Sequence, residues 1–309
     1  MKIKVKNLEK KFGKTHALKN ISFEFQSKQI FGFVGPNGAG KTTTLRILAT
    51  LDDPSGGDAY INGFSVTQYP EEVRKTIGFM PDTLPEHNDI TVHEYLDFFA
   101  RAYGLKGKKR RQSIEGVEEF TNLTGIREKM LKALSKGMKQ RVSLARALVH
   151  DPPVLLMDEP AAGLDPRARI ELRELLKILS GQDKAILISS HILTELTELC
   201  DGAIIIEQGK ILQTGTIEQL VEKKTPHLSL LVRSCNRQDA LFKALMEMPK
   251  VKDVRHSGKE IQVELEGGEE DGSDLLAALV QQGHRISEFK LQQSDLEDIF
   301  MRVTKGEVQ

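Results

Sequence analysis

Hydrophobic and polar positions change their period several times along this chain of 309 residues. Polar and apolar residues alternate at residues 3–5 and 21–25, which is typical of strands in an antiparallel sheet. Between residues 91 and 150 the apolar positions follow a helical period instead. One face of the first helix there carries Val92, Tyr95, Leu96 and Phe99. The pattern therefore predicts an antiparallel β region near the N-terminus and a helical region at about residues 86–150.

Continuous apolar runs on either side of this helical region predict strands that are buried on both faces. They occupy residues 30–34, 154–157, 185–188 and 203–206. Strands covered by helices on both faces of a parallel sheet have this composition. A helical pattern at 42–51 follows the first run, and a helix that begins after the N-cap Asp165 and Pro166 follows the second. This alternation predicts an α/β core with a parallel sheet.

The composition shifts near residues 222–226, where we place a domain boundary. Two domains are also the expectation from chain length. The predicted elements beyond the boundary are a strand at 228–232, a helix at 240–248, strands at 251–255 and 261–265, a helix at 275–282 and a strand at 286–291. This β-α-β-β-α-β order predicts a small ferredoxin-like α+β domain, followed by a last helix at 296–303. We therefore expect one domain at 1–222 and a second at 227–309.

The most specific motif is the sequence GPNGAGKT at residues 35–42. It matches Gly-x-x-x-x-Gly-Lys-[Ser/Thr] and lies between a predicted strand and a predicted helix, which aims backbone N–H groups and a helix dipole at an anion. Lys41 supplies a charge for the β- and γ-phosphates, and Thr42 a hydroxyl for Mg²⁺. The expected nucleotide contacts are Gly35, Pro36, Asn37, Gly38, Ala39, Gly40, Lys41, Thr42 and Thr43. The alternative is a glycine-rich turn in an ordinary α/β fold.

Two acids, Asp158 and Glu159, follow the predicted strand at 154–157 directly. Ligands bind at the carboxyl ends of strands in α/β sheets. We expect Asp158 to hold Mg²⁺ through water and Glu159 to polarise an attacking water. Adjacent acids at a strand end also occur as helix caps or as plain surface charge.

Two further features are informative because they occur together with the glycine loop and the two acids. Residues 134–141, LSKGMKQR, open a predicted helix with Ser135 as its N-cap, and such a helix start is a second anion site within one chain. His191 follows the strand run 185–190 directly, although a single histidine is usually structural.

The order and spacing of these motifs resemble the ATP-hydrolysing subunit of ABC transporters over about residues 1–220. The resemblance implies that Phe12 stacks on adenine, that Glu159 and His191 are catalytic, and that Asp165 lies in a loop coupling two sites. It also implies that ATP is sandwiched between two subunits, each facing the other's phosphate loop with a signature helix. The signature residues, which would contact the ATP of the partner subunit, are Ser135, Lys136, Gly137, Met138, Lys139 and Gln140.

The fold class expected from motifs and resemblance is a P-loop NTPase core of α/β type with an antiparallel β subdomain and a helical subdomain. The small ferredoxin-like domain follows it and resembles the extra domain on ATPases of type-2 exporters. The segment 90–96 looks like part of the region that docks on a membrane permease. The implied protein is a Mg²⁺-dependent ATPase working as a homo- or heterodimer on the cytoplasmic face of the cell membrane, beneath a separate permease, with export as the expected direction.

The chain departs from the family pattern in two places. The usual Leu-Ser-Gly-Gly-Gln appears as Leu-Ser-Lys-Gly-Met-Lys-Gln. Asp82 stands where the family usually has a Gln that touches Mg²⁺. A carboxylate is a good ligand for a hard cation, so Asp82 is a candidate metal residue, and a turn after Pro81 is the alternative.

The composition indicates which partners and which cellular compartment to expect. Lys plus Arg and Asp plus Glu number 44 each, which favours no nucleic-acid partner. We expect the basic run at 106–111 to be a solvated loop before a helix. Two cysteines point to a reducing compartment, and no apolar run approaches the ~18 residues of a membrane span.

Two other functions are weighed against a transporter subunit. A soluble ABC ATPase acting on ribosomes or DNA commonly carries tandem ATPase units or a long coiled coil, and this sequence shows neither. A nucleotide-gated binding module without useful hydrolysis would not need Glu159 and His191.

Overall fold

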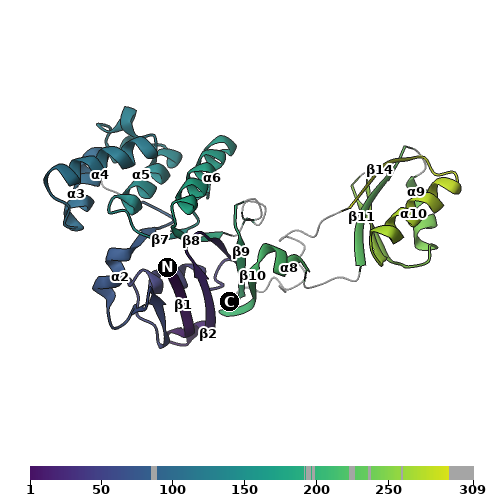
Figure 1. Ribbon diagram of the computed structural model, residues 1–309, viewed down its shortest axis with the longest axis horizontal. Coiled ribbons are helices and arrows are strands. Elements are labelled where there is room, and N and C mark those ends of the chain that lie inside the picture. The colour runs from purple at the N-terminus through teal and green to yellow at the C-terminus, as the bar shows by residue number, and fades with distance from the viewer. Residues whose placement is uncertain are drawn as a thin grey trace. The chain divides into compact units, whose positions relative to one another are not determined.

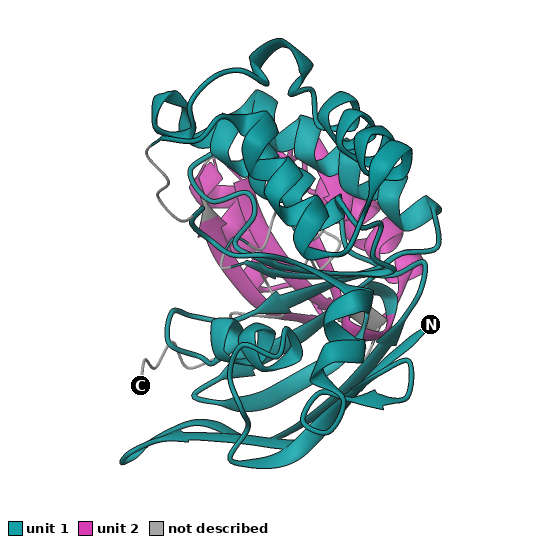
Figure 2. Ribbon diagram, turned by 90° about the vertical axis from the view of Figure 1, so that its left-hand side faces the viewer, with its two compact units in different colours: residues 1–218, 300–309 teal, residues 219–299 magenta. Residues whose placement is uncertain are grey.

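The chain forms two compact units. The computed structural model describes residues 1–84, 89–190, 192, 196, 199–222, 227–235, 238–258 and 260–291. The first unit contains Met1–Glu218 (teal in Figure 2), and the second lies within Gln219–Ile299 (magenta). The helix predicted at 296–303 lies outside the described residues.

The first unit begins with an antiparallel sheet of four strands in the order β2-β1-β4-β5. Its strands are β1 (Lys2–Phe12), β2 (Thr15–Gln26), β4 (Gly56–Ile61) and β5 (Phe64–Ser65). Along β2, Ile21, Phe23 and Phe25 are buried and alternate with exposed residues. The alternation seen in the sequence therefore corresponds to one buried face, as predicted.

The central sheet has six strands in the order β10-β9-β3-β8-β7-β6. They are β3 (Ile30–Val34), β6 (Ile77–Met80), β7 (Val154–Asp158), β8 (Ala185–Ser190), β9 (Gly202–Glu207) and β10 (Lys210–Thr216). All neighbours are parallel except β10, which runs antiparallel to β9. In β3, β7, β8 and β9 every residue is buried, which confirms the predicted parallel core. The carboxyl ends of β3, β7 and β8 lie side by side, since Val34 pairs with Ser190 and Asp158 with Ser189.

Helices complete the core of the first unit. They are α1 (Lys41–Leu48), α2 (Pro70–Thr76) and α6 (Pro166–Gly181), while α8 (Ile217–Glu222) crosses the boundary between the two units. Helix α1 contacts β7 as well as β2, and Leu45, Ile47 and Leu48 are fully buried in the cluster shared by both sheets. Each such side chain contributes about 1.5–3 kcal/mol by burial. Packing therefore fixes the helix that follows the glycine loop.

A separate helical region contains α3 (Val92–Ala102), α4 (Gly107–Phe120) and α5 (Lys136–Leu148). These helices gather at one end of the first unit in Figure 1, and the antiparallel sheet lies at the other. A capping box joins Thr91 and Glu94 at the start of α3. Val92, Tyr95 and Leu96 are buried in a core of this region's own. The predicted helical region is thus confirmed as a packed layer.

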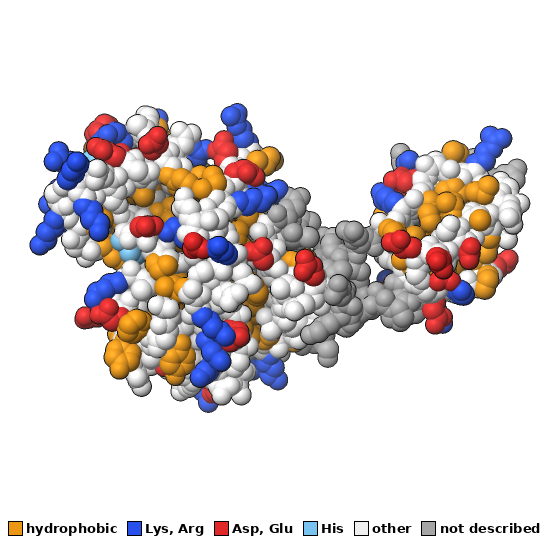
Figure 3. Space-filling view, viewed as in Figure 1, with side chains coloured by type: hydrophobic (Ala, Val, Ile, Leu, Met, Phe, Trp, Pro, Cys, Tyr) orange, Lys and Arg blue, Asp and Glu red, His pale blue; other side chains and the backbone are white. Residues whose placement is uncertain are grey.

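The prediction for the basic run at 106–111 was wrong. Lys106 is the N-cap of α4, and the residues after it belong to the helix. Lysine and arginine are good helix formers, and the buried Ile114 anchors the helix face. Arg110 Nε lies 2.9 Å from Asp97 Oδ1 on α3, which offsets the crowding of like charges. Figure 3 shows acidic groups interspersed with basic ones over this region.

The second unit has the predicted β-α-β-β-α-β order. Its elements are β11 (His227–Ser234), α9 (Gln238–Met246), β12 (Val251–Ser257), β13 (Glu260–Glu266), α10 (Glu269–Gln281) and β14 (Ile286–Leu291). The sheet order is β12-β13-β11-β14, all antiparallel. Leu230, Val232, Leu241 and Leu275 share its buried core. This is the predicted ferredoxin-like arrangement.

Among the described residues, none of the helices combines the length and apolar character that crossing a bilayer requires.

Candidate active site

The loop between β3 and α1 has the geometry of an anion site. Gly38 and Gly40 have φ of 79° and 107°, in the region that favours glycine, and Gly40 is the N-cap of α1. A Cβ at Gly35 would lie 2.2 Å from the backbone oxygen of Ile206. The glycines therefore allow both the tight turn and its close packing on β9, and they direct the start of α1 into the loop.

Lys41 lies folded over this loop. Its Nζ donates to the backbone oxygens of Gly35 at 2.7 Å and Pro36 at 3.2 Å, and it lies 3.8 Å from Glu159 Oε1. Burial lowers the pKa of Lys41, and the nearby carboxylates of Glu159 and Asp158 oppose that shift. The cation is thus held at the loop by groups that an incoming phosphate can replace.

The two acids lie beside the loop at the end of β7. Asp158 is 3% exposed, and its Oδ1 accepts hydrogen bonds from Thr42 Oγ1 at 3.1 Å and Ser189 Oγ at 2.6 Å. Glu159 has φ of 47°, an uncommon value for a residue other than glycine. Its backbone N–H donates to Ser189 Oγ at 3.0 Å and to the Ser189 backbone oxygen at 3.2 Å. The turn after β7 therefore brings Asp158 to Thr42 and Glu159 to Lys41.

Ser189 is the residue of this cluster that sequence reasoning missed. The only signal available was its place in the run Ser189-Ser190-His191 at a strand end. Its pairing with Asp158 depends on the register of β7 and β8, which the sequence does not state.

Lys41, Thr42, Asp158 and Glu159 line a common hollow. Its volume of about 350 Å³ is within the range of small-molecule sites. Its lining contains Ala17, Asn37, Gly38, Ala39, Gly40, Lys41, Thr42, Thr43, Asp82, Asp158 and Glu159. Asp82 is exposed in a bend after β6, and its backbone oxygen accepts a hydrogen bond from Gln140 Nε2 at 3.3 Å. Phe12 is 51% exposed at the end of β1, with Lys10 Nζ 4.9 Å from the ring centroid. Phe12 is not part of that lining.

The predicted signature residues lie outside the lining of this hollow. Ser135 caps α5 by accepting a hydrogen bond from the Met138 N–H at 3.3 Å, while Gly137 and Gln140 line a different hollow of about 310 Å³ between α5 and α6. The Lys136 side chain lies against Gly163, where an added Cβ would come 2.4 Å from Nζ. Gln140 thus faces its own chain, whereas Ser135 and Lys136 are exposed. Lys139 is half-buried in the same first turns.

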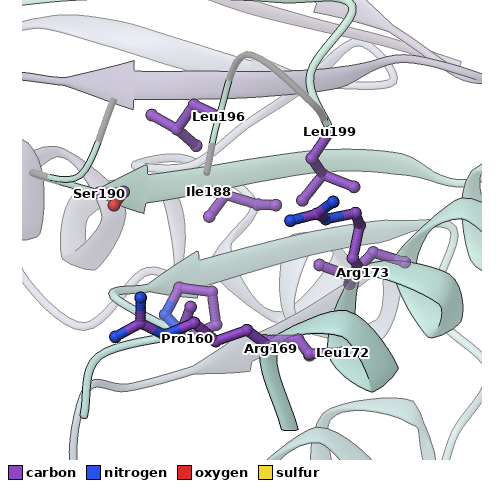
Figure 4. A pocket seen from close by; sticks show the side chains of 10 residues that line it. Pro160, Arg169, Leu172, Arg173, Ile188, Ser190, Leu196 and Leu199 are labelled. Atoms are coloured by element: carbon purple, nitrogen blue, oxygen red, sulfur yellow. The ribbon is translucent and has the colours of Figure 1, made fainter. Parts of the chain in front are cut away.

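Asp165 and His191 are the remaining predicted site residues. Asp165 is the N-cap of α6, with Oδ1 accepting from the Ala168 N–H at 3.0 Å, as predicted from the sequence. His191 lies outside the described residues. Figure 4 shows a small pocket beside β8, with Arg169 and Arg173 of α6 and Ser190 of β8 in its lining. At about 40 Å³ it is too small for a nucleotide.

The oxygen groups beside the loop fit Mg²⁺. The Thr42 hydroxyl and the Asp158 carboxylate are hard ligands that already contact each other. Within the described part of the chain, no group of three or more His, Cys, Asp or Glu residues could hold a metal ion. Mg²⁺ commonly binds through one or two carboxylates together with substrate phosphates. The donor set is therefore suited to a metal that arrives with a nucleotide.

Comparisons with protein families cover both units. A family model described as ABC transporter matches residues 18–162. A model described as the C-terminal domain of DrrA1-3-like ATP-binding proteins matches residues 215–304. A third, described as an AAA domain, matches residues 129–197.

Similar proteins extend over most of the chain. It is 28% identical to the linearmycin resistance ATP-binding protein LnrL of Bacillus subtilis (strain 168), over 98% of this chain and 98% of that protein. It is 38% identical to the Nod factor export ATP-binding protein I of Burkholderia lata, over 72% of this chain and 73% of that protein.

Solved structures give the same result. The structure of an ATP-binding subunit of an ABC transporter has a TM-score of 0.66 and 30% identity, covering 71% of this chain and 92% of that one. A dimeric ATP-binding cassette in a post-hydrolysis state, bound to ADP and Pi, has a TM-score of 0.64 and 25% identity, covering 69% of this chain and 98% of that one. With relatives of this similarity and coverage, the chain belongs to the family of ABC transporter ATP-binding proteins and is the ATP-binding subunit of such a transporter.

Proposed function

We propose that this subunit is a Mg²⁺-dependent ATPase and that the hollow beside the phosphate loop is its catalytic site. The observation that carries the proposal is that Lys41 and Thr42 of α1 and Asp158 and Glu159 at the end of β7 line one hollow of about 350 Å³. Phosphoryl transfer to water needs positioning and charge neutralisation rather than a covalent intermediate. These four side chains supply the required cation, metal ligands and base.

Each residue has a defined task in this scheme. Lys41 moves from the carbonyls of Gly35 and Pro36 to the β- and γ-phosphates, and the loop N–H groups hold the remaining phosphate oxygens. Thr42 and Asp158 would hold Mg²⁺, which would supply charge neutralisation at the phosphates. Glu159 orients the attacking water and accepts its proton. Phe12 offers its exposed ring face to adenine.

We further propose that ATP is bound between two such subunits. The exposed Ser135 and Lys136 at the start of α5 lie outside the lining of their own chain's hollow, so they are suited to another subunit's nucleotide. A helix N-terminus with a capping serine favours an anion. The dimeric cassette bound to ADP and Pi supports this arrangement. The partner is a second ATPase subunit, identical or different, Asp165 belongs to the loop that couples the two sites, and His191 is a catalytic residue.

A membrane permease is the third component of the proposal. A groove of about 500 Å³ is lined by residues of α1, α3 and α5 and includes Arg46, Phe99, Tyr103 and Arg146. In the segment 90–96, Val92, Tyr95 and Leu96 are buried and cannot contact a permease. The permease therefore docks on this groove and on Phe98 beside it, which is 60% exposed. The subunit is then peripheral on the cytoplasmic face of the membrane. The names of the relatives in linearmycin resistance and Nod factor export favour export.

The test is the Glu159→Gln variant. It should lower steady-state ATP turnover by about 10²-fold or more, the scale for losing a general base, while ATP binding is preserved. The measurement is Mg²⁺-dependent phosphate release, with chelation of Mg²⁺ as the second arm. Glu174→Gln, which changes an exposed acid of α6, is the matched control and should leave turnover unchanged. Near-normal turnover of Glu159→Gln would make Glu159 a surface acid and contradict the proposed role.

A further inference from the structure

Ser189 occupies a fully buried position near the ends of two neighbouring strands. It is 0% exposed, near the end of β8, and pairs in register with Asp158 at the end of β7. Its neighbours Ile188 and Ser190 both line the small pocket of Figure 4. Side chains alternate between the two faces of a strand, so Ser189 points to the opposite face. That face carries the phosphate loop.

The Ser189 hydroxyl makes a hydrogen bond to each of the two acids. It donates to Asp158 Oδ1 at 2.6 Å and accepts from the Glu159 backbone N–H at 3.0 Å. A serine hydroxyl has one proton to donate, and here that proton goes to a carboxylate, which makes the bond charge-assisted. The same side chain therefore touches the acid assigned to Mg²⁺ and the backbone of the acid assigned to water.

These two bonds have separate geometric effects. Thr42 and Ser189 donate to the same oxygen of Asp158, and two donors on one oxygen restrict rotation of the carboxylate. The bond to the Glu159 N–H supports the left-handed backbone there, with φ of 47°. Such a conformation persists only where its surroundings hold it. Ser189 thus contributes to the direction in which each acid faces.

We propose that Ser189 is a positioning residue that sets Asp158 for the metal and Glu159 for the attacking water at the same time. This inference rests on the proposed ATPase function. Ser189 acts through the two acids and not by contact with the nucleotide. Its loss therefore changes both the Mg²⁺ requirement and the catalytic rate, whereas loss of an ordinary buried hydroxyl changes stability alone.

The experiment compares Ser189→Ala with Ser143→Ala. Ser143 is also 0% exposed, but its hydroxyl has no hydrogen-bond partner among the described residues. We expect Ser189→Ala to raise the Mg²⁺ concentration for half-maximal ADP binding about tenfold and to lower kcat about 10- to 100-fold. ADP binding in a chelator should not change. Ser143→Ala should match the unmodified chain in all three measurements, and Ser189→Thr, which keeps the hydroxyl, should recover most of the Mg²⁺ response.

The outcomes separate this inference from the function on which it rests. If the unmodified chain binds ADP with no Mg²⁺ dependence, the proposed metal site fails. If the unmodified chain depends on Mg²⁺ and Ser189→Ala shows the same dependence, only the role of Ser189 is overturned, even where its melting temperature falls. Should the alanine variant not fold, Ser189→Cys keeps the volume with a weaker donor and carries the same test. An unchanged Mg²⁺ requirement in that variant overturns the inference.

Discussion

The first unit contains two helix N-termini assigned to phosphates, at α1 and at α5, and they differ in what the chain builds around them. At α1, Lys41 and Asp158 are 6% and 3% exposed and belong to a cluster of hydrogen-bonded groups around a hollow. At α5, Ser135 and Lys136 are exposed. Groups that are already oriented in a partly buried site stabilise a charge strongly, because they need not rearrange when the charge arrives. One chain therefore builds the phosphate loop fully, while the exposed start of α5 is suited to a site completed by another subunit.

The largest effect is expected from a substitution at the buried phosphate loop before α1. Lys41→Ala removes the cation at the loop together with its ion pair to Glu159, and should lower ATP turnover by about 10²- to 10³-fold, the scale for losing a preorganised donor. ATP affinity of the isolated subunit should fall about tenfold or more. Fluorescent-nucleotide titration and phosphate release measure the two quantities. Lys28→Ala, at an exposed lysine paired with Asp183, is the control. Unchanged ATP affinity in Lys41→Ala would show that the buried cluster is not the nucleotide site.

The contrast also shows what local sequence can predict. The phosphate loop and the N-caps Ser135 and Asp165 follow from residues near one another in the chain, because capping and glycine turns are short-range effects. The buried strands follow from continuous apolar runs in the same way.

Long-range geometry was beyond such patterns. The bond from Ser189 to Asp158 needs the register of two strands. The bond from Gln140 to the Asp82 backbone oxygen needs the packing of α5 on the end of β6. For the basic run 106–111, charge alone predicts a loop, whereas helix propensity and the pairing of Arg110 with Asp97 favour the observed helix.

A smaller effect is expected at Asp82, which is exposed on the rim of the hollow. If its carboxylate contributes to the metal site, Asp82→Ala should raise the Mg²⁺ concentration for half-maximal ATPase activity about two- to fivefold, as expected for an exposed charge. Asp82→Gln should restore part of the response, since its amide oxygen is still a ligand. The measurement is a Mg²⁺ titration of turnover. If both variants titrate like the unmodified chain, Asp82 is a turn residue and the metal assignment is wrong.

The central claim is that the start of α5 completes a nucleotide site on another subunit, and ATP-dependent association of the Glu159→Gln chain tests it most directly. Light scattering of the purified variant should show a dimer with ATP and a monomer without it, because uncleaved nucleotide stabilises closure. Adding Ser135→Arg should abolish the dimer, since a bulky cation blocks approach of the γ-phosphate, while ATP binding to the monomer stays within about twofold of its former value. If Ser135→Arg instead weakens ATP binding to the monomer as much as it weakens association, α5 serves its own chain's nucleotide and the account is contradicted.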